Sequence, residues 1–242
     1  MKKFSYGIAL LMTVGLTACS TTDHNQGNST ASSTVQTENK NKAAFDKATS
    51  LTAGWPEAST LAAREIIVKH GDPQETTSET LIWRNIAPFK RIIVHKTTYQ
   101  HKFPFLHQNA VEHVVDYRAP ASKVQSVWNY NGSIVLDRTK GEMSAFGDNE
   151  SQNILALNLA HDVLTGKRGT DNARVTYGKE MLSYMNGNMT AMTQVLSFGG
   201  QYQTQDPGTS IENKIRWQGL PSQTPATNQN LNLRQAQEEK KR

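Results

Sequence analysis

The large apolar residues of this 242-residue chain are concentrated between residues 51 and 217, and this distribution is the strongest constraint on its fold. Residues 20–50 consist mainly of Ser, Thr, Asn, Gln and Lys, with Val35 and Phe45 as their only large apolar residues. Residues 218–242 are rich in amides, prolines and charged groups. Because such segments bury too little apolar surface to offset the entropy of ordering them, we expect disordered flanks. The remaining stretch of about 165 residues is long enough to fold as one domain without a metal or a disulfide.

The spacing of apolar residues inside this domain predicts both helices and strands. The predicted helices span residues 57–69, 150–165 and 171–185, and the predicted strands span residues 80–84, 91–98, 133–138 and 140–146. Residues 110–117 fit either element, and a last apolar segment covers residues 189–198. Helices and strands do not alternate regularly, which favours an α+β fold. We therefore expect a single α+β domain in which three to four helices pack on one face of a small antiparallel sheet.

Residues 1–18 have the parts of a secretory signal peptide. Lys2 and Lys3 supply the charged start, and the apolar segment at residues 6–16 is shorter than the roughly 20 residues that cross a membrane. The sequence Leu-Thr-Ala-Cys follows at residues 16–19 and resembles the lipobox of bacterial lipoproteins. The resemblance implies cleavage before Cys19, transfer of a diacylglyceryl group to its thiol, and acylation of the new amino terminus by palmitate or a similar chain.

A lipoprotein resemblance also implies a location. Two or more acyl chains on Cys19 form a stable membrane anchor, and residues 19–50 would then be a flexible tether between anchor and domain. Ser20 stands where lipoproteins of the inner membrane carry Asp, so the implied location is the outer membrane facing the periplasm, or the cell surface. Cys19 is the only cysteine of the chain, so it has no partner here for a disulfide.

Charge is distributed unevenly along the domain. Between Glu79 and Glu112 the chain has no acidic residue, and aromatic residues are interleaved with its positive ones. The positive residues of this basic ribbon are Arg84, Lys90, Arg91, Lys96 and Lys102. Such a segment predicts a surface for an anionic envelope polymer or an envelope protein, the alternative being a solvated sheet edge protected by lysines. The formal net charge of +5 is too small to indicate a nucleic-acid partner.

Two other groups of residues suggest alternative functions. His161 with Asp162 or Glu142 would give a small envelope hydrolase its base and acid, although Asp162 also suits a structural ion pair with Arg174. His95 and His101 are six residues apart and share one face of an unbroken strand, as zinc or copper ligands would.

Familiar catalytic motifs are missing from the chain. It contains no GxSxG, GxxxxGK[ST], HExxH or GxGxxG sequence, and we expect no cofactor. Residues 141–174 are similar to secreted bacterial proteins of unknown function, and that similarity implies no activity. The sequence therefore favours a non-enzymatic lipoprotein that binds an envelope component, with a hydrolase and a metal carrier as alternatives.

Overall fold

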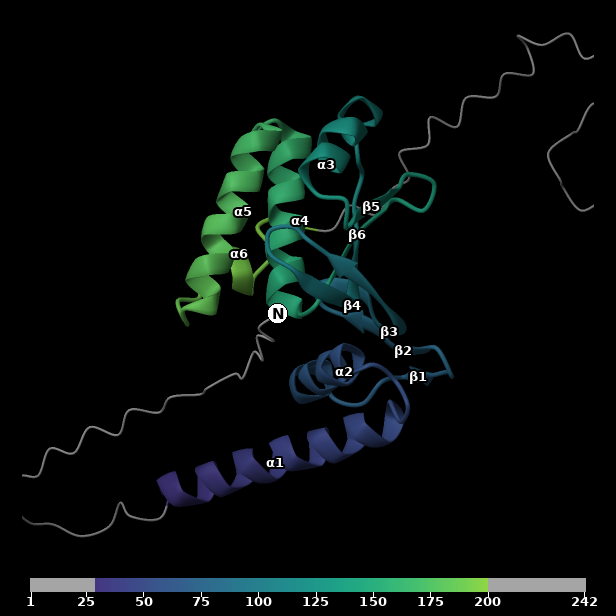
Figure 1. Cartoon of the computed structure of the whole chain (residues 1–242), viewed down its shortest axis with the longest axis vertical. Helices are drawn as coiled ribbons and strands as arrows, with labels where there is room; N and C mark the ends of the chain where they lie inside the picture. The colour runs from purple at the N-terminus through teal and green to yellow at the C-terminus, as the bar shows by residue number, and fades with distance from the viewer. Residues whose placement is uncertain (1–28, 200–242) are drawn as a thin grey trace, which may run out of the picture.

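The computed structural model describes residues 29–199, which form one antiparallel sheet with helices packed against it (Figure 1). The helices are α1 (Ser29–Leu51), α2 (Glu57–His70), α3 (Val124–Tyr130), α4 (Glu150–Thr165), α5 (Thr170–Met185) and α6 (Ala191–Gln194). The strands are β1 (Glu75–Thr76), β2 (Thr80–Ile86), β3 (Phe89–His101), β4 (His107–Asp116), β5 (Ile134–Asp137) and β6 (Glu142–Gly147). The strands pair in the order β1-β2-β3-β4-β6-β5, and every neighbouring pair is antiparallel.

The predicted α+β domain with an antiparallel sheet is confirmed. The three predicted helices are present as α2, α4 and α5, and the last apolar segment contains α6. The ambiguous residues 110–117 belong almost entirely to β4, while α1 and α3 had no counterpart in the prediction. Within residues 29–199, no helix combines the length and the apolar character needed to cross a membrane.

Helix α4 is the centre of the fold. The side chain of Asn149 accepts a hydrogen bond from the backbone N–H of Gln152 at 2.8 Å, which caps the start of the helix. Gly166 adopts a left-handed conformation with φ of 79° and ends it. Nearly every residue of α4 is buried, because the sheet covers one side of the helix while α3, α5 and α6 cover others. This enclosure explains why its apolar residues are not confined to one stripe.

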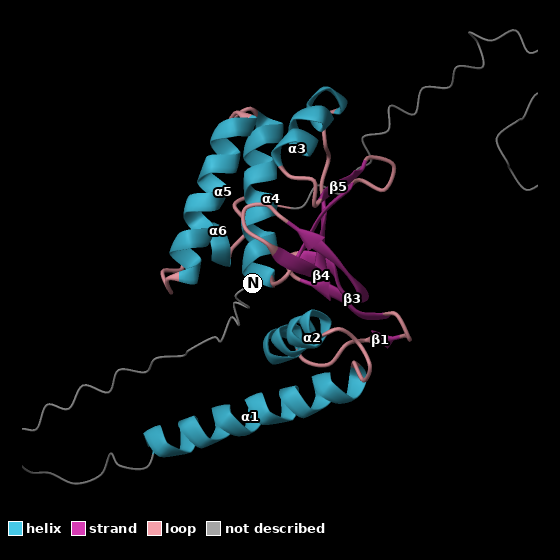
Figure 2. Cartoon of the chain, viewed as in Figure 1, coloured by secondary structure: helices cyan, strands magenta, loops and turns pink. Residues whose placement is uncertain are grey.

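Strand alternation divides the sheet into two faces. One face packs against the helices, with α2 against β3 and β4 and with α4 against β4, β5 and β6 (Figure 2). Its fully buried side chains include Leu81, Trp83, Ile92, Val94 and Val111. The residues between them point to the opposite side, which we call the open face because the described helices leave it uncovered. This face carries the candidate site.

The tether predicted over residues 19–50 is wrong for residues 29–50, which form most of α1. Ala44 and Ala48 are one helical turn apart and are buried where α1 packs on α2. Alanine has the highest helix propensity, and its small side chain lets two helices approach closely. The prediction considered only large apolar residues and so missed this packing. Residues 1–28 and 200–242, which include the signal peptide, Cys19 and the predicted tail, lie outside the described residues.

Candidate functional site

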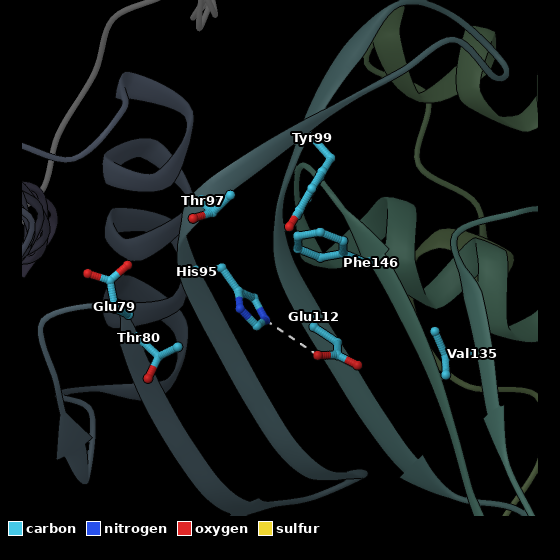
Figure 3. Close-up of a pocket in the computed structure, with 8 residues that line it drawn as sticks. All are labelled: Glu79, Thr80, His95, Thr97, Tyr99, Glu112, Val135 and Phe146. Atoms are coloured by element: carbon cyan, nitrogen blue, oxygen red, sulfur yellow. Dashed lines mark ion pairs between the residues drawn. The ribbon is translucent and has the colours of Figure 1, made fainter.

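Two adjoining depressions lie on the open face. The larger has a volume of about 390 Å³ and is lined by Glu79, Thr80, His95, Thr97, Tyr99, Glu112, Val135 and Phe146 (Figure 3). The smaller has a volume of about 230 Å³ and is lined by Arg91, Glu112, Val114, Val135, Asp137, Lys140, Glu142 and Ser144. Glu112 and Val135 belong to both, so the two depressions form one continuous hollow across β2 to β5.

Three rings and one carboxylate converge in the larger depression, as Figure 3 shows. The ring of Phe146 lies between those of His95 and Tyr99, with centroid distances of 5.1 and 6.0 Å and inclinations of 69° and 70°. His95 Nε2 is 3.4 Å from a carboxylate oxygen of Glu112. Tyr99 is 61% exposed, although it is a large aromatic residue. The larger depression therefore combines electron-rich rings, an acid and solvent access.

Glu112 is ionised at neutral pH. Burial alone would raise the pKa of its carboxyl group, but interactions with the side chains of His95 and Ser144 and the positive charge of Arg91 outweigh that effect. The pKa of Glu112 consequently lies below its usual value. A negative charge therefore lies beside the aromatic rings.

An irregularity in β3 shapes this part of the face. The register between β3 and β4 shifts between Val94 and Tyr99. A bulge of this kind increases the local twist of a strand and redirects its side chains. His95, Thr97 and Tyr99 fall within or beside the shift, and all three line the larger depression.

The smaller depression is dominated by ion pairs. Both terminal nitrogens of Arg91 donate to the carboxylate of Glu142, at 2.9 and 2.7 Å. Lys90 lies 2.7 Å from Asp116 and 3.0 Å from Glu142. The hydrogen bonds from Arg91 outweigh the effect of burial and hold the pKa of Glu142 below its usual value. The charges of Lys90, Arg91, Asp116 and Glu142 are therefore compensated by one another within the protein.

The predicted basic ribbon is therefore not an uncompensated positive surface. Arg84 pairs with Glu75, and Lys96 pairs with Glu79 at 3.1 Å. Lys90 and Arg91 are paired as described above, and Lys102 is exposed just beyond the end of β3. The ribbon lacks acidic residues in the sequence, but carboxylates from neighbouring strands and loops neutralise four of its five cations in the fold.

The two histidines of the predicted metal site are not together. His95 contacts Glu112 on the open face, whereas His101 Nδ1 is 3.1 Å from the hydroxyl of Ser133 and its ring packs edge-on against His107. Across residues 29–199, no three His, Cys, Asp or Glu side chains are grouped so that they could hold a metal ion. The metal-carrier alternative has no site in this part of the chain.

The residues of the hydrolase alternative are each held by a different partner. His161 Nδ1 is 2.8 Å from the hydroxyl of Tyr117, and its ring stacks on Phe198 with centroids 4.7 Å apart. Burial lowers the pKa of His161. Asp162 accepts a hydrogen bond from Arg168 Nε at 2.7 Å, and Glu142 is held by Arg91 on the open face. These three residues do not form a catalytic group.

The suggested ion pair between Asp162 and Arg174 is wrong. Arg174 donates to the carbonyl oxygen of Tyr130 at 2.7 Å, and its guanidinium lies 3.9 Å from the centre of the Phe103 ring. Arg174 thus attaches α5 to the end of α3 and to the β3–β4 connection. Asp162 pairs with Arg168 in place of Arg174.

The sequence analysis missed a buried polar cluster where α2, α4 and β4 meet. Glu150 Oε2 is 2.6 Å from His70 Nε2 and 3.3 Å from Nε2 of His113, which is completely buried. Asn153 Nδ2 donates to Val111 O at 2.9 Å and to His113 Nδ1 at 2.8 Å, which leaves the proton of His113 on Nε2. His113 is the last of four histidines that are spaced six residues apart in the sequence, at positions 95, 101, 107 and 113, but only the fold brings Glu150 to it. Because His113 and Asn153 are fully buried and their polar atoms are already paired, the cluster joins three elements rather than forming a binding site.

Comparisons with models of protein families, with curated proteins and with solved structures found no match for this chain. The functional argument therefore depends on the open face and on the lipobox.

Proposed function

We propose that this protein is a membrane-anchored lipoprotein of the bacterial envelope whose α+β domain binds another envelope component, without catalysis, through the open face. The observation that carries the proposal is the continuous hollow on an uncovered sheet face. A binding module needs an accessible, shaped surface. His161, Asp162 and Glu142, each held by a different partner, give no comparable support for hydrolysis.

Charge at the open face favours a protein over an anionic polymer. The two depressions are lined by four carboxylates, those of Glu79, Glu112, Asp137 and Glu142. The same linings include Arg91 and Lys140 as their only Lys or Arg side chains. Arg91 and Lys140, like the neighbouring Lys90 and Lys96, are already paired with carboxylates, so these cations would have to give up existing ion pairs to bind a polyanion. We therefore infer an envelope protein as the partner, and neither nucleic acid nor a cofactor has a role in the proposal.

The proposed anchor is the lipid on Cys19, and α1 would act as a spacer between membrane and domain. At 1.5 Å per residue, the 23 residues of α1 span about 35 Å. Among residues 36–51 of this helix, Ala44 and Ala48 are the buried ones, and they pack against α2. We propose the outer membrane facing the periplasm, or the cell surface, as the location, because Ser20 follows the cysteine.

The anchor is tested with Cys19→Ser in cells supplied with labelled palmitate. We expect the natural protein to incorporate label and to sediment with membranes, and the variant to do neither. Label and membrane association in the variant would contradict the lipobox interpretation.

The binding face is tested by placing a photoreactive amino acid at Val135, which is 55% exposed on the open face. Val175 on α5 is a matched control, because it is 57% exposed and lies away from the two depressions. Irradiation of living cells should give a defined protein adduct from position 135 and none from position 175. Identical adducts from both positions, or none from position 135, would contradict binding through the open face.

A further inference from the structure

The geometry points to a specific role for the larger depression: it is a site for a cationic side chain, lysine or arginine, presented by the protein partner. This inference depends on the proposed function, because it names the chemistry that the open face recognises. It follows from three properties of the depression, namely the pairing of its charges, the arrangement of its rings and the hydroxyl groups on its rim.

Among the carboxylates that line the two depressions, Glu112 has an exceptional partner. Glu79 pairs with Lys96, Asp137 pairs with Lys140, and Glu142 pairs with Arg91 and Lys90. Glu112 instead faces His95, whose imidazole carries a full charge only when it is protonated, and the hydroxyl of Ser144, while the charge of Arg91, which is itself paired with Glu142, also acts on it. Their separation of 3.4 Å is also longer than an ordinary hydrogen bond. Glu112 can therefore accept a shorter, charge-assisted hydrogen bond from an incoming ammonium or guanidinium group.

The aromatic rings add a second preference for a cation. The faces of Phe and Tyr rings carry negative electrostatic potential and attract ammonium and guanidinium groups within about 6 Å. The rings of His95 and Tyr99 are inclined to that of Phe146 by 69° and 70°, so the three rings form an angled aromatic surface rather than a flat one. Tyr99 is left largely in solvent at the entrance, where it would cover the aliphatic part of a lysine or arginine side chain.

Hydroxyl groups complete the set of acceptors. Thr80 and Thr97 line the same depression as Glu112. The Thr80 hydroxyl is hydrogen-bonded to that of Thr77 at 2.9 Å, but a hydroxyl oxygen has two lone pairs and can accept a further hydrogen bond. An ammonium group has three donors and a guanidinium has five, so neither is satisfied by one carboxylate alone. The depression of about 390 Å³ offers the rings, the acid and the hydroxyls together.

The experiment is a nuclear magnetic resonance titration of the full-length lipidated protein in detergent micelles. The probes are Nα-acetyl-lysine amide, Nα-acetyl-arginine amide and Nα,Nε-diacetyl-lysine amide, which keeps the lysine chain but removes its charge. We expect both cationic probes to shift the amide signals of residues 95, 99, 112 and 146 saturably in the millimolar range. The diacetylated probe should bind at least fivefold more weakly.

Two variants identify the groups responsible. Glu112→Gln keeps the size of the side chain and should weaken binding of the cationic probes at least fivefold. Tyr99→Ala changes an exposed residue outside the core, so it should leave the rest of the spectrum unchanged and weaken binding two- to fivefold. The matched control Glu57→Gln, at the exposed start of α2, should have no effect.

Each contrary result overturns this inference. The two outcomes are equal binding of the charged and diacetylated probes, and no binding of any probe. Such a result leaves the photocrosslinking test of the open face intact. Conversely, saturable binding of the cations without any crosslink from position 135 would support the site and refute the proposed partner in the envelope.

Discussion

Asp148 lies between β6 and α4, and its carboxyl group should limit the stability of the domain at neutral pH. Burial raises its pKa to about 6, an effect that the nearby positive charge of His107 only partly offsets and the negative charge of Glu65 reinforces. Asn149 Nδ2 donates to Asp148 Oδ1 at 2.7 Å. At pH 7 the group is ionised in a site that favours its neutral form. Asp148→Asn removes this charge while keeping the acceptor oxygen, so the variant should be more stable than the natural protein.

The magnitude follows from the shift. A rise from 3.8 to about 6 is roughly two pKa units, which corresponds to about 3 kcal/mol at 1.36 kcal/mol per unit. Because the pKa is raised in the folded state, the contribution is favourable below pH 4 and is lost as the pH rises toward 6. The new amide group needs its own hydrogen-bond acceptor, which costs about 1 kcal/mol where none is found. The expected net stabilisation at pH 7 is therefore about 1–3 kcal/mol, and it should disappear near pH 4.

Urea unfolding of the full chain, followed at half-unit steps from pH 4 to pH 7.5, measures this difference. The free energy of unfolding of Asp148→Asn minus that of the natural protein should increase from pH 4 to about pH 6 and then level off. Glu38→Gln, which changes an exposed carboxylate on α1, should give a difference that stays within about 0.5 kcal/mol. A difference for Asp148→Asn that does not change with pH would refute the assigned burial of its charge.

Three further substitutions test the packing at the start of α4. Gly147→Ala should lower the free energy of unfolding by about 1–3 kcal/mol in thermal melts, because the added Cβ would lie 2.4 Å from Asn153 Oδ1. An unchanged melting temperature would show that the Asn153 side chain moves aside freely. Asn153→Ala should lower the free energy of unfolding by about 1–3 kcal/mol, since His113 Nδ1 and the Val111 carbonyl lose their hydrogen-bond donor. The nitrogen chemical shifts of His113 should report a changed tautomer. An unchanged tautomer would refute the hydrogen bond assigned between Asn153 and His113. Glu150→Gln should cost about 3 kcal/mol at pH 7, because the hydrogen bonds and charges of the surrounding groups outweigh burial and lower the pKa of Glu150 to about 2. A carboxyl group with a lowered pKa stabilises the fold above pH 4.5, and this stabilisation is lost as the pH falls toward 2. The free energy of unfolding of Glu150→Gln should therefore fall less steeply between pH 4.5 and pH 2 than that of the natural protein.

The helices could be predicted where several local signals coincide. For α4, a capping Asn149, a continuous apolar run and a terminating Gly166 all agree, and the predicted bounds equal those of the structure. Each signal depends only on residues close in the sequence. The start of α1 had no such signals, and its packing depends on two alanines rather than on large apolar residues.

The electrostatics of the site could not be predicted in the same way. Lys90 pairs with a carboxylate 26 residues away, and Arg91 pairs with one 51 residues away. Such partners are brought together by strand register, which a single sequence does not specify. A segment without acidic residues is therefore not evidence of a positive surface in a sheet, because each strand lies beside strands from other parts of the chain.

The distribution of polar groups over the two sheet faces supports binding through the open face. On the helical side, buried polar residues hold elements together: Asn158 donates to the carbonyl oxygens of Met192 and Val195, and Asp162 holds Arg168. A solvated face of an antiparallel sheet normally carries polar side chains. Beside such side chains the open face presents Val135 and Phe146 within its hollow, and its Lys and Arg charges are already neutralised by pairing. Apolar and aromatic groups in an accessible hollow gain from being covered, which makes this face the part of the described domain best suited to a partner.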